Sequence, residues 1–264
     1  MVTPLTVLKL GGSVITNKKK KSTPSNRTIS QIMKEISPDI AGSLVIVHGG
    51  GSYGHHLAKH YRLSEGYRDQ SQILGFVKTR QSMMELNKII LHSAIENGLP
   101  CVSLQPSAFV ETKNKRIEKI DTHIIADLLK LRMIPLLFGD VVLDQKLGFC
   151  VLSGDQLVSR LATELEAKQI VLTVDVVGVF DSDPRIDRKA RLMEKMAAAD
   201  IKKLIQKRGK STQHPDVTGE MTGKLREMLP ALKKGTRVII LNGRVPGRLS
   251  EALSGKTPVG TVIE

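Results

Sequence analysis

The sequence predicts an α/β fold, an open and mainly parallel β-sheet sandwiched by helices. Short apolar runs rich in β-branched residues recur along the 264 residues, and longer segments with helical spacing separate most of them. Strands bounded by glycine or proline that alternate with helices are typical of βαβ units and a parallel sheet. With 41% hydrophobic residues, the chain also has enough apolar material for a large core.

The expected elements follow in order along the chain. Strands are expected at residues 5–10, 44–48, 100–104, 134–138, 170–174 and 237–241. Helices are expected near residues 28–40, 70–98, 122–132, 154–167, 192–206 and 223–234. Two segments depart from this alternation: residues 140–152 predict a β-hairpin, and residues 109–121 predict a second hairpin or an exposed excursion. The region 140–153 is the expected boundary between two lobes, residues 1–150 and 151–264.

Composition and charge limit the function. The net charge is +14, which suits nucleic acid or an anion-binding site. Aromatic residues make up only 3% and tryptophan is absent, so little is available for stacking on bases, and nucleic-acid binding is not expected as the main role. No apolar run approaches the roughly 18 residues of a membrane helix. The start of the chain shows no signal-peptide pattern and Cys101 and Cys150 form no C-x-x-C motif, so a cytoplasmic protein with reduced cysteines is expected.

Four glycine-containing loops carry the polar chemistry, and they are expected where ligands bind in open α/β sheets, beyond the carboxyl ends of the strands. They are KLGGSVITNK (9–18), HGGGSYGH (48–55), LSGDQLVSRLA (152–162) and DVTGEMTGKLREML (216–229). Each loop alone could be an ordinary turn, Asp155 could be a helix-capping acid, and Lys18 and Lys224 could be surface residues. Lys9 lies inside an apolar strand, where a lysine is costly to bury without an anion. Together the loops indicate a site for an anionic ligand.

Two familiar phosphate motifs do not explain these loops. Gly49, Gly51 and Gly54 satisfy G-x-G-x-x-G, but no second strand ending in an acidic residue follows about 20 residues later. The segment SGKT at 254–257 resembles the end of a Walker A motif, but Ser250 stands where its first glycine belongs. A cradle of backbone N–H groups reinforced by lysines remains, which suits phosphoryl transfer from a nucleotide that carries Mg²⁺.

The residues also bear on the acceptor. An alcohol acceptor usually needs a carboxylate base, whereas a phosphomonoester, with a second pKa near 6, is already nucleophilic at neutral pH. The first half of the chain offers His55 and lysines around the glycine-rich loop and no obvious paired carboxylates. A phosphate-bearing acceptor is therefore favoured, with His55 as a hydrogen-bond donor. The alternative is a histidine that only caps a helix start.

These motifs resemble a known family. KLGGSVIT-K, VHGGGSYGH, FGDVV, LSGD, TVDVVGVFDSDP and DVTGEMTGK occur in the order found in the amino acid kinase superfamily. Within it the chain is most similar to the isopentenyl phosphate kinases, mainly through His55. The resemblance implies a homodimeric kinase that converts isopentenyl phosphate to isopentenyl diphosphate with ATP and Mg²⁺. It implies that residues 1–150 bind the acceptor and that residues 151–264 bind ATP.

The same resemblance implies roles for individual residues. The catalytic residues would be Lys9, Lys18, His55, Asp155 and Lys224. The ATP-binding residues would be Lys9, Gly11, Gly12, Ser13, Gly51, Thr173, Asp175, Phe180, Asp183 and Lys224. The acceptor-binding residues would be Gly50, Gly54, His55 and Gly139. No protein ligand to a metal ion is implied.

Two positions depart from the family's pattern. Val177 stands where a polar or acidic residue is common, which puts nucleoside contacts there in doubt. Glu220 replaces the second glycine of a TGG motif, and it is expected to point away because a carboxylate repels ATP phosphates.

A prenyl acceptor also needs an apolar pocket, and the loop at Lys18–Lys21 could close over the phosphates. The helix at 73–95 supplies candidates for the pocket, most of them expected in the core instead: Ile73, Phe76, Val77, Met83, Met84, Leu86 and Ile90.

Two rival functions remain open. One is a related kinase with a phosphonate, amino acid or nucleotide acceptor, and the other is a basic RNA-binding or sensor protein without catalysis.

Overall fold

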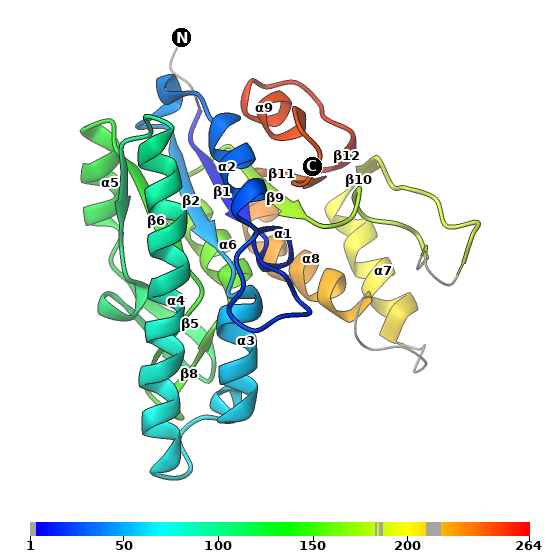
Figure 1. Ribbon diagram of the computed structural model, residues 1–264. Helices are drawn as coiled ribbons and strands as arrows, with labels where there is room; N and C mark the ends of the chain where they lie inside the picture. Colours follow the sequence, from blue (N-terminus) through cyan, green and yellow to red (C-terminus); the bar gives the residue numbers. More distant parts are fainter. Residues whose placement is uncertain (1–3, 183, 185–186, 210–217) are drawn as a thin grey trace.

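The structure is a computed structural model that describes residues 4–182, 184, 187–209 and 218–264 (Figure 1). An eight-stranded sheet forms its centre, in the order β10-β12-β11-β9-β1-β2-β6-β3, and all paired neighbours are parallel except β11 and β12. The strands are β1 (Thr6–Leu10), β2 (Leu44–His48), β3 (Cys101–Ser103), β6 (Ile134–Phe138), β9 (Gln169–Val174), β10 (Lys195–Met196), β11 (Arg237–Asn242) and β12 (Gly260–Ile263). The predicted α/β class is confirmed.

Helices cover both faces of this sheet (Figure 1). Residues of α5 (His123–Lys130), α6 (Gly154–Glu164), α7 (Ala198–Gly209) and α8 (Thr218–Lys233) pack on one face. Residues of α1 (Gly12–Ile15), α2 (Asn26–Lys34), α3 (Gly51–His60), α4 (Ser71–Glu96) and α9 (Arg248–Leu253) pack on the other. Because both faces are covered, β1, β2 and β6 are buried along their whole length, which explains their continuous apolar runs.

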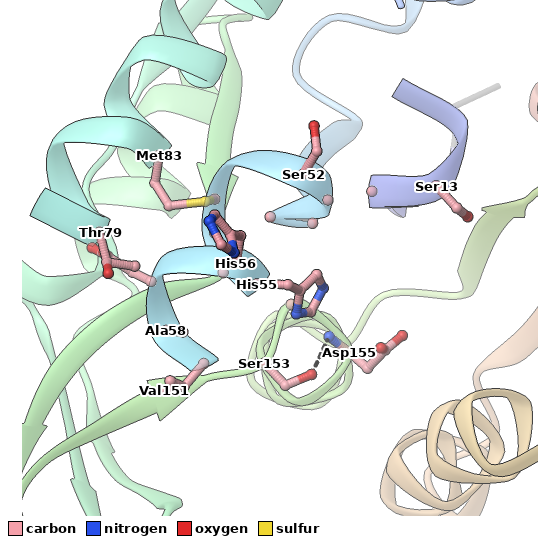
Figure 2. Close-up of a pocket in the computed structure, with 18 of the residues that line it drawn as sticks. Ser13, Ser52, His55, His56, Ala58, Thr79, Met83, Val151, Ser153 and Asp155 are labelled. Atoms are coloured by element: carbon pink, nitrogen blue, oxygen red, sulfur yellow. Dashed lines mark hydrogen bonds between the residues drawn. The ribbon is translucent and has the colours of Figure 1, made fainter. Parts of the chain in front are cut away.

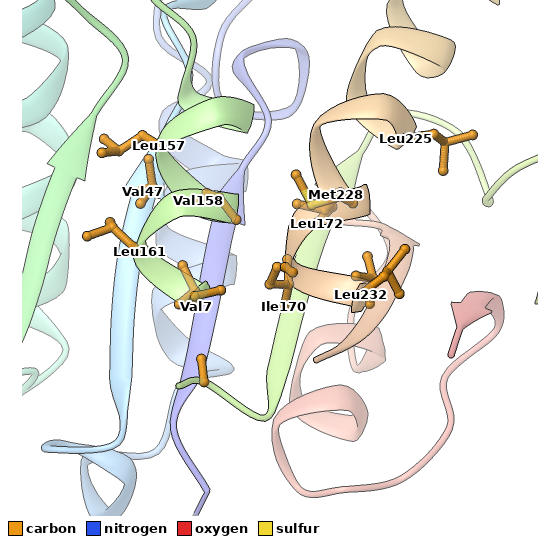
Figure 3. Packing of buried hydrophobic residues seen from close by; sticks show 14 of the residues in the cluster. Val7, Val47, Leu157, Val158, Leu161, Ile170, Leu172, Leu225, Met228 and Leu232 are labelled. Atoms are coloured by element: carbon orange, nitrogen blue, oxygen red, sulfur yellow. The ribbon is translucent and has the colours of Figure 1, made fainter. Parts of the chain in front are cut away.

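Alternation along the strands divides the core into two layers. Val7 of β1 faces α6 and α8, whereas its neighbour Leu8 faces the opposite layer. Figure 3 shows the first layer, where side chains of β1, β2 and β9 meet apolar residues of α6 and α8. This packing holds α6 and α8 beside the central strands, with Gly154 and Lys224 both near the end of β1 at the cavity described below.

A second sheet of four strands has the order β5-β4-β7-β8. Its strands are β4 (Val110–Lys113), β5 (Arg116–Ile120), β7 (Asp140–Asp144) and β8 (Gly148–Leu152), and they form the two predicted hairpins. The buried carboxylate of Asp144 holds both turns, because it accepts hydrogen bonds from the backbone N–H groups of Asn114, Lys115, Lys146 and Leu147. β7 begins two residues after β6 ends, so this sheet extends from the carboxyl end of the large one.

Some predicted boundaries are wrong. The helix expected at 28–40 ends at Lys34, the helix expected at 192–206 begins at Ala198 after β10, and α8 begins at Thr218 rather than near 223. The strands β10 and β12 and the helices α1, α3 and α9 were not predicted from the sequence. Short 3₁₀ turns also occur at Pro38–Ile40, Leu63–Glu65 and Pro106–Ala108. Across the described residues, no helix has the length and apolar character to cross a membrane.

The two expected lobes share one sheet. β1 and β2 come from residues 1–150 and β9 comes from residues 151–264, and β1 pairs directly with both β2 and β9. The division of ligands between the two halves stays a prediction.

Candidate functional site

A cavity of about 820 Å³ lies at the carboxyl ends of the central strands, where all four glycine-containing loops meet. Its wall includes Lys9, Gly12, Ser13 and Lys18 from the first loop and Gly49, Gly50, Gly51, Gly54 and His55 from the second. It also includes Gly139, Gly154 and Asp155, and, from α8, Glu220, Gly223 and Lys224. The structure therefore brings together residues that are more than 200 positions apart in the chain.

The first two loops touch each other through glycine. A Cβ atom on Gly12 would collide with the backbone of Gly51, and a Cβ atom on Gly51 would collide with the hydroxyl of Thr16. Gly51 also has a φ of +48°, a left-handed conformation that suits glycine. Larger residues here would separate the loops, so the close approach of the two backbones depends on these glycines.

Thr16 connects the two loops directly, a role that was not predicted from the sequence. Its hydroxyl donates a hydrogen bond to the carbonyl oxygen of Gly12 (2.7 Å) and accepts one from the backbone N–H of Ser52 in the first turn of α3 (3.0 Å). Thr16 is fully buried. The hydroxyl therefore satisfies one of the unpaired N–H groups at the start of α3 and fixes it against the first loop.

Lysines and carboxylates alternate across the cavity. Lys9 forms an ion pair with Asp155, and Asp155 lies 3.7 Å from Lys224, measured from Oδ2 to Nζ. Lys224 in turn pairs with Glu220 at 2.9 Å, and Glu220 reaches Lys18 at 3.3 Å. Each carboxylate thus lies between two lysines, and the network runs from the core of the sheet to the mouth of the cavity.

The charges in this network shift two carboxylate pKa values downward. Burial raises the pKa of Asp155, but Lys9 and Lys224 outweigh burial and hold it below the ordinary value. For Glu220, burial is again the largest effect, but Lys224 and Lys18 together lower its pKa to about 2. Both groups are therefore ionised at neutral pH.

The expectation that Glu220 points away from the site is wrong. Its side chain faces the cavity and contacts Lys18 and Lys224. The side chain of Glu220 turns into the cavity because two lysines attract it. The expectation rested only on repulsion by ATP phosphates.

Asp155 lies in the first turn of α6 and His55 in the second turn of α3, and both line the cavity (Figure 2). The hydroxyl of Ser153 caps α6 by accepting a hydrogen bond from the backbone N–H of Asp155 (3.1 Å). Desolvation by the surrounding protein lowers the pKa of His55, and nearby Lys224, Lys9 and Lys18 lower it further while Glu220 opposes them. The imidazole is consequently neutral at pH 7, able to donate one hydrogen bond and accept another.

Not every residue assigned to ATP lies in the cavity wall. Within the described part of the chain, Gly11, Thr173, Asp175 and Phe180 are not among the residues that line it. Thr173 instead joins β9 to β1, because its hydroxyl donates to the Lys9 carbonyl oxygen (3.1 Å) and accepts from the Gly11 N–H (3.1 Å). Asp175 lies 4.0 Å from Lys18, and Asp183 is outside the described residues.

One end of the cavity is apolar. Its wall there includes Ala58 of α3, Thr79 and Met83 of α4, and Val151 of the small sheet (Figure 2). Val141, which pairs with Val151 in that sheet, also lines the cavity. Of the seven apolar residues noted at 73–95, only Met83 lines this cavity.

The other six lie elsewhere. Leu86 and Ile90 are in the core, Ile73 and Val77 are exposed, Phe76 packs against Phe149, and Met84 lines a separate cavity of about 260 Å³. Ala58, Val141 and Val151 were not predicted, because their positions depend on how α3 and the β7–β8 hairpin fold back on α4.

The comparisons with known proteins agree with this geometry. The chain matches the amino acid kinase family over residues 4–242. It is 37% identical to the isopentenyl phosphate kinase of Methanothermobacter thermautotrophicus, with 97% of this chain and 98% of that protein covered. It is 33% identical to the isopentenyl phosphate kinase of Methanocaldococcus jannaschii, with 98% of each covered. A crystal structure of an isopentenyl phosphate kinase superposes with a TM-score of 0.85 at 34% identity, covering 98% of this chain and 100% of the other.

Proposed function

The chain belongs to the amino acid kinase family, and from this premise we propose that its cavity transfers a phosphoryl group from ATP to isopentenyl phosphate. The protein is a phosphotransferase, and its acceptor is itself a phosphate. The observation that carries this proposal is a single cavity with lysines around two glycine loops at one end and an apolar wall at the other.

We place the ATP phosphates against Lys9, Gly12, Ser13 and Lys224. Backbone N–H groups at helix starts and lysine side chains favour phosphate, and these residues lie on the side of the cavity formed by α1, α6 and α8. The assignment of ATP to residues 151–264 is part of this proposal, although Lys9 and the first loop come from the other half.

The acceptor is placed on the opposite wall. Its phosphate would lie at Gly50 and Gly54, with Gly51 between it and the ATP phosphates. His55 would donate a hydrogen bond to it, and Gly139 would leave room for close approach. A Cβ atom on Gly139 would lie 3.0 Å from the backbone N of Gly154, which supports a requirement for glycine there. The prenyl chain would extend into the apolar end formed by Ala58, Thr79, Met83, Val141 and Val151.

The reaction needs positioning and charge more than a base. An oxygen of the acceptor phosphate forms a bond to the γ-phosphorus of ATP while the bond to the bridging β,γ oxygen breaks and ADP leaves. Lys18 would neutralise charge on the transferring group, and Asp155 would hold Lys9 and Lys224 in place. Because the acceptor is already an anion, no residue has to remove a proton from it.

Mg²⁺ would enter with the nucleotide. The described residues contain no group of three or more His, Cys, Asp or Glu side chains that could hold a metal ion, and the carboxylates of the network are engaged by lysines. Mg²⁺ is often bound largely through substrate phosphates, and it would supply further neutralisation of their charge.

We also infer a homodimer and a cytoplasmic location. Ile73, Val77, Met84 and Ile95 are each about half exposed and share one face of α4, beside the end strand β3, which suits a partner of the same kind. Sedimentation of the wild type and of Met84→Glu tests the homodimer. A dimer that dissociates in the variant supports it, and a monomeric wild type contradicts it.

The proposed cytoplasmic location is supported by the cysteines. Neither Cys101 nor Cys150 forms a disulfide, as is usual in a reducing compartment.

The test of the proposed function is an acceptor panel. ATP consumption is measured with isopentenyl phosphate beside phosphonate, amino acid and nucleoside monophosphate acceptors, for the wild type and His55→Ala. Turnover of isopentenyl phosphate that falls strongly in the variant is the expected result. If another acceptor is phosphorylated instead, and at the same rate by His55→Ala, the protein is still a kinase. The proposed acceptor and the proposed role of His55 are then both contradicted. No turnover of any acceptor would favour a binding protein.

A further inference from the structure

Glu220 joins two segments of the chain across the mouth of the cavity. Its Oε1 lies 2.9 Å from Nζ of Lys224, one turn later on α8, and its Oε2 lies 3.3 Å from Nζ of Lys18, the last residue of the first glycine loop. The second contact spans 202 residues of sequence. One carboxylate therefore bridges two lysines that belong to different parts of the phosphate site.

The contacts of Glu220 resemble those that a phosphate would make. A carboxylate and a phosphate are both acceptor groups that pair with ammonium groups at such distances. Lys18 and Lys224 are the two lysines that the proposed function assigns to the transferring group and to ATP. With its pKa near 2, Glu220 is charged throughout the neutral range and competes as a full anion.

The contacts are also easily exchanged. The side chain of Glu220 is 49% exposed and that of Lys18 is 52% exposed, so both can turn toward solvent at little cost in desolvation. Lys224 is only 14% exposed and keeps its second carboxylate neighbour, Asp155, when Glu220 leaves. A ligand could thus replace Glu220 without leaving Lys224 unpaired.

We propose that Glu220 is a built-in competitor of the nucleotide, occupying the place of a phosphate between Lys18 and Lys224 until ATP displaces it. This inference rests on the proposed function for the identity of the nucleotide. Glu220 would then determine how tightly the protein binds ATP, and it would keep Lys18 drawn toward α8 in the free protein. The consequence is a weaker affinity for ATP than the lysines alone would give.

The test is a binding experiment that needs no acceptor. Calorimetric titration with a non-hydrolysable ATP analogue and Mg²⁺ compares the wild type with Glu220→Gln, which keeps the shape and removes the charge. The analogue is expected to bind the variant about tenfold more tightly, or ~1.4 kcal/mol. Glu220→Gly removes the whole side chain and is expected to act in the same direction, which provides a second test if one variant folds poorly.

Two controls separate competition from a general change in charge. Glu164→Gln removes an acidic charge from α6, where Glu164 pairs with Arg160 outside the cavity, and it is expected to leave the affinity within about twofold. Adenosine lacks phosphates, so its affinity is expected to be equal in the wild type and both Glu220 variants.

Several results would overturn the inference. Equal or weaker binding of the analogue to both Glu220 variants than to the wild type would mean that Glu220 positions the lysines instead of competing with phosphate. If no form of the protein binds the analogue, there is no nucleotide for Glu220 to compete with, and the inference is also overturned. A wild type that binds the analogue but leaves isopentenyl phosphate unchanged would contradict only the proposed function, because the acceptor is not part of this experiment.

Discussion

Lys9 and Asp155 form an ion pair in the interior of the protein, with only 6% and 13% of their side chains exposed. Lys9 comes from the central strand β1 and Asp155 from the first turn of α6. The second oxygen of Asp155 faces Lys224 at 3.7 Å. One carboxylate thus contacts two lysines, one through each oxygen. Its pairing with Lys9 explains why a lysine is tolerated in an otherwise apolar strand.

The first prediction concerns this pair. Asp155→Asn is expected to destabilise the fold by about 3–5 kcal/mol, because a buried lysine loses its partner. It is also expected to reduce kcat by about a hundredfold, since Lys9 and Lys224 lose their common anchor. Denaturant unfolding and steady-state kinetics measure the two effects.

A double variant distinguishes the pair from its packing. Lys9→Met combined with Asp155→Asn removes both charges and is expected to recover much of the lost stability but none of the activity. Asp127→Asn is a matched control, because its partner Lys130 is exposed and its loss is expected to change stability by less than about 0.5 kcal/mol. A single Asp155→Asn variant as stable as this control would contradict the argument.

The position of the site could be predicted from the sequence because it depends on the topology. Lys9, Gly50 and Gly139 each lie at or just after a strand of one parallel sheet, and the carboxyl ends of parallel strands meet at one edge. The order of strands and helices was equally accessible, because continuous apolar runs and helical spacing are local patterns. The short antiparallel strand β12 was missed because four residues carry little periodicity.

The details of the site could not be predicted in the same way. The direction of Glu220 depends on a balance between attraction to two lysines and repulsion by a ligand, and only the structure shows where the lysines lie. The apolar wall depends on tertiary packing, since Ala58 and Val151 come from segments with no shared pattern in the sequence. Thr16 stands inside a recognised motif, but its bridging hydroxyl becomes visible only when α3 is placed.

The second prediction concerns Thr16. Thr16→Val leaves the Ser52 N–H without its hydrogen bond in a partly buried place, which is expected to cost about 1–3 kcal/mol and to lower kcat/KM by about tenfold or more. Thr16→Ser keeps the hydroxyl and is expected to retain most of the activity. Thr163→Val is the matched control, because the Thr163 hydroxyl bonds only within α6, to the Ser159 carbonyl oxygen. Equal activity of the Val and Ser variants would show that the hydroxyl does not connect the loops.

The third prediction is a pH dependence of stability that originates at His48. His48 is fully buried and stacks on Phe138, and burial lowers its pKa to about 4 from an ordinary value of 6.5. Between pH 6.5 and pH 4 the unfolded chain therefore binds more protons at this position than the folded protein does. Stability is expected to fall as the pH decreases through this window, by about 2–3 kcal/mol in total.

Replacement of this histidine isolates its contribution. His48→Gln keeps a polar group near the Gly49 carbonyl oxygen and Asn87, and it is expected to flatten the stability curve between pH 6.5 and pH 4. Unfolding in urea at several pH values, with the exposed His92→Gln as control, provides the measurement. A slope that persists unchanged in His48→Gln would assign the pH dependence to other groups.

The fourth prediction concerns proton uptake by His55. In the free protein, desolvation by the surrounding protein and three lysines hold the pKa of His55 below 6.5, so the ring is neutral at pH 7. A dianionic phosphate beside the ring favours the protonated form and raises its pKa, so binding of isopentenyl phosphate is expected to take up part of a proton at His55. Affinity for the acceptor should therefore increase as the pH falls from 8 toward 7, before the phosphate itself becomes protonated near pH 6.

Calorimetric titration in two buffers with different ionisation enthalpies measures this uptake without ATP. Protons exchanged by the phosphate group contribute equally to the wild type and to His55→Gln, so the difference between the two proteins reports His55 alone. His56→Gln provides a neighbouring control, because His56 also borders the cavity but has no assigned contact with the acceptor phosphate. The same number of protons in the wild type and His55→Gln would mean that the ring stays neutral in the complex, and His55 would then hold the phosphate through a neutral hydrogen bond or not at all.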